Sequence, residues 1–187
     1  MGKIKLIVML LMVLLILPFQ VNAREEAGTS ATLAAPKSEL KGKNKVDADL
    51  KKKVMIEVLS KYNAPLLSEV DSFMDTCIKY DLDCYLLPSI SGVESTFGRF
   101  TYAGSHNPFG WGGGYIMFDS WKEGIETVGK TMRTNYMNKW NAESIDEIAP
   151  IYAESPTWAQ KVHYFHDEFM RVEDEKRLYF AKLKVEL

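Results

Sequence analysis

Apolar residues recur along most of this chain at the spacing of an amphipathic helix. Leu50, Val54, Val58 and Tyr62 repeat every four residues, and this period predicts a first helix with one buried face. Pro65 stands where a second helix would begin, a position that proline favours. The expected inner face of the second helix consists of Leu66, Val70, Phe73, Met74, Cys77 and Ile78.

A third helix is expected from about Asp83 to Ser95, although Pro88 lies within it. Proline removes one backbone hydrogen bond, so this helix is expected either to kink or to start late. The following segment, Phe97 to Met117, contains six glycines and cannot form a helix. We expect a small β-hairpin or an irregular lobe there. It is not a phosphate-binding loop, because no Gly-Lys-Ser/Thr follows the glycines.

The C-terminal part of the chain returns to a helical pattern with recognisable helix starts. Ser120 to Glu123 and Ser144 to Glu147 both match the capping box, in which a Ser and a Glu cap each other's backbone amides. The second box opens a short helix that reaches Ala153, and Ser155-Pro156 precedes the last helix. The two long helices should bury Trp121, Ile125, Val128, Met132 and Tyr136, and Trp158, Val162, Phe165, Phe169 and Val172.

The first 23 residues are typical of an export signal. Lys3 and Lys5 precede an unbroken apolar run over residues 6–17, and Val21-Asn22-Ala23 ends in a small residue suited to cleavage. The run is short for a membrane-spanning helix, which needs about 20 apolar residues, although an uncleaved anchor is the alternative. Residues 24–45 are poor in apolar side chains and are expected to form a flexible linker. Residues 46–187 then form one mainly α domain.

Charge and cysteine content agree with an exported protein. The formal net charge is −2, and cleavage of the signal removes two lysines, so the mature chain is more acidic still. This charge argues against nucleic acid as a partner, because that role needs a basic surface. Cys77 and Cys84 are expected to form a disulfide or to stay as two buried thiols. In one continuous helix their Cα atoms would lie about 10 Å apart, so a bridge requires a turn between them.

Glu94 is the leading candidate for chemistry. It closes a small, apolar helical stretch just before the glycine-rich segment. A carboxyl among apolar neighbours tends to keep its proton near neutral pH, and a protonated carboxyl can act as the general acid that cleaves a glycosidic bond. The alternative is an ordinary glutamate that points into water at a helix end.

Four blocks of residues, in order, resemble the peptidoglycan glucosaminidases of glycoside hydrolase family 73, within the lysozyme-like superfamily. They are Glu94-Ser95-Thr96-Phe97-Gly98, Asn107-Pro108-Phe109-Gly110-Trp111, Phe118 to Glu123, and Tyr152 to Ala159. The segment Tyr80-Asp81-Leu82-Asp83 also resembles the turn before the catalytic glutamate of lytic transglycosylases. The resemblance covers about residues 65–170 and implies a lysozyme-like helical domain with a small lobe.

The resemblance implies a role for each matching residue. Glu94 would be the general acid, and Tyr152 the active-site tyrosine that faces the reacting sugar. Ser95, Asn107, Phe109 and Gly110 would line the sugar groove, with Trp111 beside them. The alternatives are a core position for Tyr152 and an exposed loop aromatic for Trp111, while Trp121 and Trp158 are expected in the core.

The chain departs from many glucosaminidases in one respect. No Asp or Glu occurs between Ser95 and Phe118, so the lobe offers no second carboxylate. Asp119 and Glu123 are expected to serve the start of the next helix. Without a base, either the substrate's 2-acetamido group attacks the anomeric carbon, or a 6-hydroxyl attacks and leaves an anhydro product.

The sequence therefore predicts an exported, monomeric glycosidase that acts on the glycan strands of peptidoglycan, without metal or organic cofactor. It would reside in the periplasm, the cell wall or outside the cell, or be held at the membrane by its N-terminal segment. His163 and His166 are expected on a solvated helix face rather than in a metal site. A wall-binding module without turnover is the rival hypothesis. The bond cleaved and the choice between hydrolysis and transglycosylation stay open.

Overall fold

A computed structural model describes residues 37–185, and over this range the chain is mainly helical with no strand. None of the helices in this range is both long enough and apolar enough to cross a membrane. The predicted export signal and most of the predicted linker lie outside the described residues. In chain order the elements are α2 (Lys37–Lys61), η1 (Pro65–Glu69), α3 (Val70–Tyr80), α4 (Leu86–Ser95), α5 (Trp121–Thr131), η2 (Met132–Met137), α6 (Ile145–Tyr152) and α7 (Trp158–Val185).

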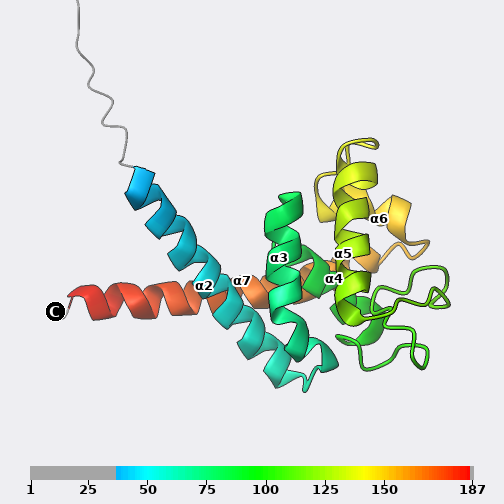
Figure 1. Cartoon of the computed structure of the whole chain (residues 1–187), viewed down its shortest axis with the longest axis horizontal. Helices are drawn as coiled ribbons and strands as arrows, with labels where there is room; N and C mark the ends of the chain where they lie inside the picture. The colour runs from blue at the N-terminus through cyan, green and yellow to red at the C-terminus, as the bar shows by residue number, and fades with distance from the viewer. Residues whose placement is uncertain (1–36, 186–187) are drawn as a thin grey trace, which may run out of the picture. The chain divides into compact units, whose positions relative to one another are not determined.

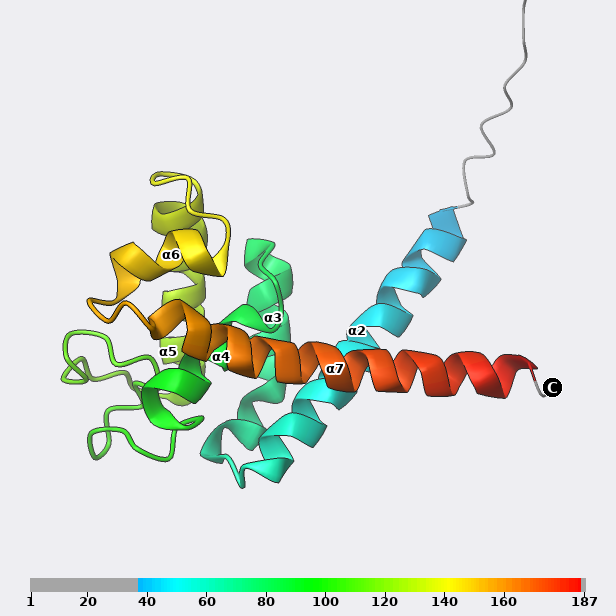
Figure 2. The same ribbon diagram turned by 180° about the vertical axis from the view of Figure 1, so that it is seen from behind.

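Helix α2 begins earlier than the sequence pattern predicts. Residues 37–45 were expected to end the flexible linker, but they form the first turns of the helix. Lys, Glu and Leu favour helix, and a helix that is already nucleated extends at little cost through such residues. Leu50, Val54 and Val58 are buried as predicted, and α2 crosses α7 in both views of the ribbon (Figures 1 and 2).

The predicted second helix divides into the 3₁₀ turn η1 and the α-helix α3. Five of its six predicted inner residues are buried, but the prediction for Ile78 is wrong, since 65% of that residue is exposed. Asp81 ends α3 in a left-handed conformation, and the turn that follows lets Cys84 return to Cys77. The two cysteines form a disulfide with their Cα atoms 4.9 Å apart, which confirms the bridged alternative.

Helix α4 starts three residues later than the sequence pattern indicates. The Asp83 carboxylate accepts a 2.8 Å hydrogen bond from the Tyr85 amide just before Leu86, the first helical residue. Pro88 is then the third residue of the helix, where its missing N–H costs nothing because the first turn has no acceptors for its amides. The late start, rather than a kink, is thus how this chain accommodates Pro88.

The segment between α4 and α5, residues 96–120, is here called the lobe. It consists of turns and bends, so the irregular alternative is confirmed and a β-hairpin does not form. Five glycines among residues 104–114 adopt positive φ values, which bend the chain too often for a ladder to extend. Within the lobe, a backbone hydrogen bond of 2.8 Å runs from the Phe118 amide to the Ser105 carbonyl.

Both predicted capping boxes begin helices. Ser144 and Glu147 cap each other's amides at the start of α6. At the start of α5, the Ser120 hydroxyl accepts from the Glu123 amide, while the Glu123 carboxylate accepts from the Asp119 amide at 2.6 Å. Glu123 is therefore committed to the helix start, as predicted, although its own partner lies one residue earlier than in the standard box.

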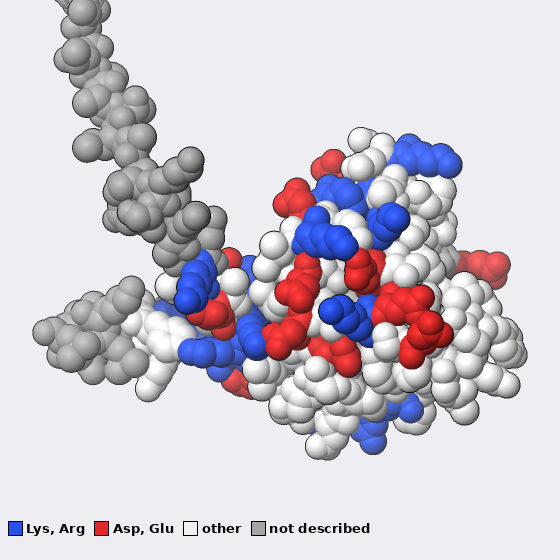
Figure 3. Space-filling model, in the orientation of Figure 1, with Lys and Arg blue, Asp and Glu red and all other residues white. Residues whose placement is uncertain are grey.

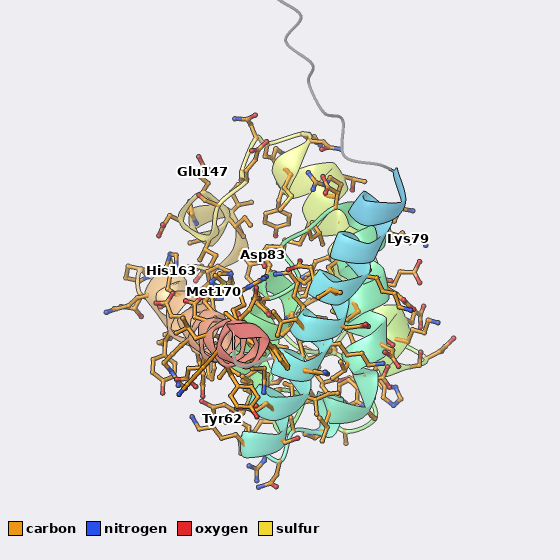
Figure 4. All side chains as sticks on the ribbon, turned by 90° about the vertical axis from the view of Figure 1, so that its left-hand side faces the viewer. Tyr62, Lys79, Asp83, Glu147, His163 and Met170 are labelled. Atoms are coloured by element: carbon orange, nitrogen blue, oxygen red, sulfur yellow. A yellow bond between two sulfur atoms is a disulfide. The ribbon has the colours of Figure 1, made fainter. Side chains whose placement is uncertain are left out.

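Helix α7 packs against α2, α4 and α6. Trp158, Val162, Phe169 and Val172 are buried on its inner face, with Phe165 half-buried. Figure 4 looks along α7, with Tyr62 and Asp83 labelled on either side of it.

Charged side chains on α7 form hydrogen bonds and ion pairs with residues of neighbouring elements. The Tyr62 hydroxyl donates to Glu168 of α7 at 2.6 Å, and His166 pairs with Asp83 at 2.7 Å. His163 pairs with Asp146 in the same way, so the two predicted solvated histidines each meet a single carboxylate.

We predict that replacing both cysteines by serine destabilises the domain by about 2–3 kcal/mol, because the bridge closes a loop of about eight residues in the unfolded chain. Urea unfolding of the native and double-variant proteins measures this. The native protein with dithiothreitol should match the variant without it. Two alkylatable thiols in denatured, unreduced protein would contradict the disulfide itself.

Candidate active site

Glu94 occupies the last turn of α4 and is half-buried. The chain turns sharply directly after it, because Thr96 and Phe97 both adopt left-handed conformations with φ values of 51° and 57°. Such a pair of non-glycine residues is costly and persists only where surrounding contacts enforce it. Here the Phe97 ring is fully buried and packs against Tyr62 and Phe165. This anchor fixes the end of the helix that carries Glu94.

The Glu94 carboxyl has one direct side-chain partner, the indole of Trp158 on α7. The indole N–H donates to Oε1 of Glu94 at 2.6 Å. Burial raises the pKa of Glu94, and the Trp158 hydrogen bond together with the charge of Lys161 only partly offsets that effect. The structure thus supports the sequence-based expectation that the Glu94 carboxyl keeps its proton to a higher pH than an ordinary glutamate does.

Two cavities meet at Glu94. The first, here called the aromatic cavity, has a volume of about 460 Å³ and is lined by Glu94 together with Trp111, Tyr136, Trp140 and Tyr152. The second, here called the lobe cavity, has a volume of about 410 Å³. Its lining includes Phe100, Thr101, Tyr102, Asn107 and Tyr115. Glu94, Gly110 and Gly113 belong to both linings, so the cavities form one groove with the carboxyl at its centre.

Gly110 allows the lobe backbone to pass directly beside the carboxyl. It has a φ of +67°, and a Cβ atom at this position would lie 2.9 Å from Oε2 of Glu94. Only glycine satisfies both conditions without a shift of neighbouring atoms. The sequence-based assignment of Gly110 to the groove therefore has a geometric basis: the residue sets the clearance around Oε2.

Three of the predicted groove residues are almost fully buried. Ser95 is 4% exposed, Asn107 2% and Phe109 1%, so the Phe109 ring has no free face. The Ser95 hydroxyl donates to the Pro108 carbonyl at 2.8 Å and accepts from the Gly98 amide at 2.9 Å. The Asn107 amide nitrogen donates to the carbonyl of Trp111 at 2.8 Å. These side chains shape the lobe from within, and the groove meets them mainly through backbone.

Tyr152, at the end of α6, lines the aromatic cavity. Its hydroxyl donates to the Phe109 carbonyl at 2.7 Å, and its ring stacks on the indole of Trp158 at a centroid distance of 4.7 Å. Burial raises the pKa of Tyr152 well above its ordinary value, and the charge of Glu94 adds to this effect. Tyr152 therefore stays neutral, and its hydroxyl bonds the lobe backbone to the end of α6.

Two tryptophans belong to the site, Trp158 through its indole and Trp111 through the cavity lining. Trp158 is buried at 3% exposure as expected of a core residue, yet it is also the hydrogen-bond partner of Glu94, which the sequence pattern gave no means to detect. Trp111 is half-buried rather than an exposed loop aromatic, and it lines the aromatic cavity. The half-buried Trp121 packs edge-to-face against His106 of the lobe.

Within the part of the chain that the structure describes, Glu94 is the only carboxylate in the lining of either cavity. Asp119 is exposed just before α5 and lines neither of them. Residues 100–118 of the lobe contain no Lys, Arg, Asp or Glu, and its charged residues Arg99 and Asp119 flank that stretch. Figure 3 shows this as a white region at the lower right, whereas charges of both signs gather over α3 and α5.

Comparison with models of known protein families and with curated proteins gave no match for this chain.

We predict that Gly110→Ala destabilises the domain by about 1–3 kcal/mol more than Gly104→Ala does. Both substitutions place an L-residue in the left-handed region, but the alanine at position 104 would have no neighbour closer than 4.0 Å. The extra cost at position 110 is the overpacking against Glu94. Urea unfolding of the two variants measures the difference, and equal losses would contradict the close approach.

We predict that Trp158→Phe raises the pKa of Glu94. The hydrogen bond from the indole favours the ionised carboxyl, so its removal leaves burial less opposed. NMR titration of the labelled Glu94 carboxyl in both proteins measures the change. A pKa that stays the same or falls would show that the indole does not act on this carboxyl in solution.

Proposed function

We propose that this chain is a peptidoglycan glycosidase with a lysozyme-like fold, and that Glu94 is its general acid. The observation that carries the proposal is a lone, half-buried carboxyl with a raised pKa where two aromatic-lined cavities meet. A glycan strand that lies along both cavities would place one of its glycosidic bonds at Glu94. Three of the four residue blocks that resemble the glucosaminidases contribute residues to this groove, whereas Phe118 to Glu123 does not.

The hydrogen bond from Trp158 specifies which oxygen of Glu94 carries the proton. An indole N–H can only donate, so Oε1 acts as an acceptor and the proton of the neutral carboxyl resides on Oε2. Oε2 is the oxygen that faces Gly110, which belongs to the lining of both cavities. The proton is therefore presented toward the centre of the groove, where the oxygen of a leaving sugar would lie.

The groove favours a mechanism in which the substrate supplies its own nucleophile. An inverting enzyme needs a second carboxyl group about 6.5–9.5 Å from the acid to activate water, and among residues 37–185 no second carboxylate joins Glu94 in the cavity linings. Attack by the 2-acetamido group of N-acetylglucosamine needs no protein base. We accordingly favour cleavage of the β-1,4 bond that leaves N-acetylglucosamine at the new reducing end.

The same missing carboxylate supports a second candidate, a lytic transglycosylase. There the 6-hydroxyl of N-acetylmuramic acid attacks and an anhydro end results. It also supports a rival of another class, a wall-binding module that retains the groove without turnover. The disulfide agrees with all three, because disulfides persist in oxidising compartments outside the cytoplasm. The N-terminal signal pattern supports export in each case.

We predict that Glu94→Gln lowers digestion of purified sacculi at least about a hundredfold, because general acid catalysis typically contributes 10²–10⁴-fold and an amide has no acidic proton to give. The variant should stay folded, and its advantage in unfolding free energy over the native protein should grow as the pH rises. This sign follows because burial raises the pKa of Glu94, so folding is disfavoured once that carboxyl ionises.

Two variants serve as controls for Glu94→Gln. Asp119→Asn and Glu123→Gln remove the first two carboxylates that follow Glu94 in the sequence, and neither residue lines the groove, so both variants should keep most of the activity. Near-normal digestion by Glu94→Gln would exclude the proposed acid. A native protein that binds sacculi but releases no fragments would favour the wall-binding module.

Mass spectrometry of the released fragments, with proton NMR of fresh digests to read the anomeric configuration, separates the two catalytic candidates. Reducing ends at N-acetylglucosamine with retained configuration would support the glucosaminidase, and anhydro-muramic ends the transglycosylase. Products of inverted configuration, together with loss of activity in Asp119→Asn, would mean that a protein carboxylate activates water after all.

A further inference from the structure

A third cavity lies between α4 and α7, beside the groove but outside its lining. It has a volume of about 480 Å³ and is lined by Gly92, Val93, Gln160, Lys161, Tyr164 and Phe165. We call it the side cavity. Val93 directly precedes Glu94 on α4, so adjacent residues of one helix turn line the side cavity and the groove. No role in the glycosidase proposed above accounts for this cavity.

Helix α7 connects the side cavity to the general acid. Trp158 donates its hydrogen bond to Glu94, and Lys161 follows three residues later. Residues three apart on a helix are surface neighbours, about 5–6 Å between Cβ atoms. The ammonium of Lys161 is exposed and close enough for its charge to act on the Glu94 carboxyl. The side cavity therefore opens within one helical turn of the site of bond cleavage.

The three cavities differ in charge. Neither cavity of the groove has a lysine or arginine in its lining among the described residues, and residues 100–118 of the lobe contain no Lys, Arg, Asp or Glu. The side cavity combines a cation, Lys161, with the amide of Gln160 and the ring of Tyr164, which is 65% exposed. Neutral sugar rings suit the groove, while the side cavity suits an anionic substituent with amide groups.

We infer that the side cavity binds the anionic peptide substituent of the sugar next to the cleaved bond. The inference rests on the proposed function, since only in peptidoglycan do the neutral glycan strands carry short acidic peptides. Lys161 would pair with a carboxylate of that peptide, Gln160 would bond its amides, and Tyr164 would cover its apolar stem. The enzyme would then prefer glycan that carries its peptides over bare glycan.

The test compares two forms of one substrate, intact glycan strands and the same strands stripped of peptides by an amidase, with the lactyl carboxylate that the amidase frees converted to a neutral methylamide. The measured quantity is the ratio of kcat/KM on intact strands to kcat/KM on stripped strands. We expect a ratio above one for the native protein. Lys161→Gln should lower that ratio about three- to fivefold through KM, the range for a partly exposed ion pair. Lys161→Arg should restore most of it.

Two features of the design isolate the side cavity. Both substrates use the same Glu94, so the ratio cancels any effect of the lost charge on the pKa of that residue. Lys182→Gln is the matched control, because Lys182 is an exposed lysine of the same helix about 30 Å farther along its axis. It should leave the ratio unchanged.

If turnover is too slow to measure, a binding measurement replaces the kinetic comparison. In the Glu94→Gln background, calorimetry compares a disaccharide that carries a pentapeptide with the same disaccharide whose lactyl group ends in a neutral methylamide. The ratio of the two dissociation constants then takes the place of the kinetic ratio. Equal dissociation constants for the two ligands, or an equal loss of affinity for both in Lys161→Gln, would contradict peptide binding in the side cavity and leave the proposed function intact. Failure to bind or cleave either form would overturn both.

Discussion

The close approach of α4 and α7 at Gly92 is the contact on which the site depends. A Cβ atom at Gly92 would lie 2.9 Å from the ring of Phe165 on α7 and equally close to the ring of Phe97. Any side chain there would push α7 away from α4. With glycine, the helices come near enough for the indole of Trp158 to reach Glu94. The hydrogen bond, the burial of the carboxyl and its raised pKa all follow from this one contact.

The pKa values of two carboxyls in this domain, Glu173 and Glu94, shift in opposite directions. Burial opposes ionisation of Glu173 on α7, yet hydrogen bonds from Tyr85, Arg177 and Lys51 outweigh it and lower the pKa of that residue. Glu94 receives one neutral donor and a more distant cation, so burial prevails and its pKa rises. Glu173 thus serves to join helices, whereas Glu94 is available for proton transfer. The number and charge of the donors, rather than the depth of burial, separates the two roles.

The central part of the lobe, residues 100–118, combines a surface without Lys, Arg, Asp or Glu with a backbone that is held in place by hydrogen bonds from side chains. Asn107 and Ser95 commit their polar atoms to carbonyls and amides of the lobe and of α4. Tyr152 adds a bond from α6 to the Phe109 carbonyl. These three contacts come from different parts of the chain and fix an irregular segment without the ladder of a sheet. The exposed aromatic residues Phe100, Tyr102 and Tyr115 are thereby presented on a stable frame, as a binding surface requires.

The sequence by itself determined the features that arise within a few residues of one another. The period of apolar positions gave the helices and most of their buried faces, Ser and Glu spacing gave two helix starts, and the glycine-rich segment marked the break between helices. The position of Glu94 at a helix end was also readable, because apolar neighbours and a following glycine are local signals. Cys77 and Cys84 were a possible pair once a turn was expected between them.

Only the tertiary structure decided what each of these elements meets. Trp158 is 64 positions from its partner Glu94, and its spacing is that of an ordinary core residue, so no local pattern distinguishes it. Ile78 has the period of a buried residue but lies at the edge of α3, where no neighbouring helix covers it. Three predicted groove residues became internal supports of the lobe for the same reason. Periodicity records which way a side chain faces relative to its own helix, whereas burial, pKa and access to a cavity depend on distant segments that fold against it.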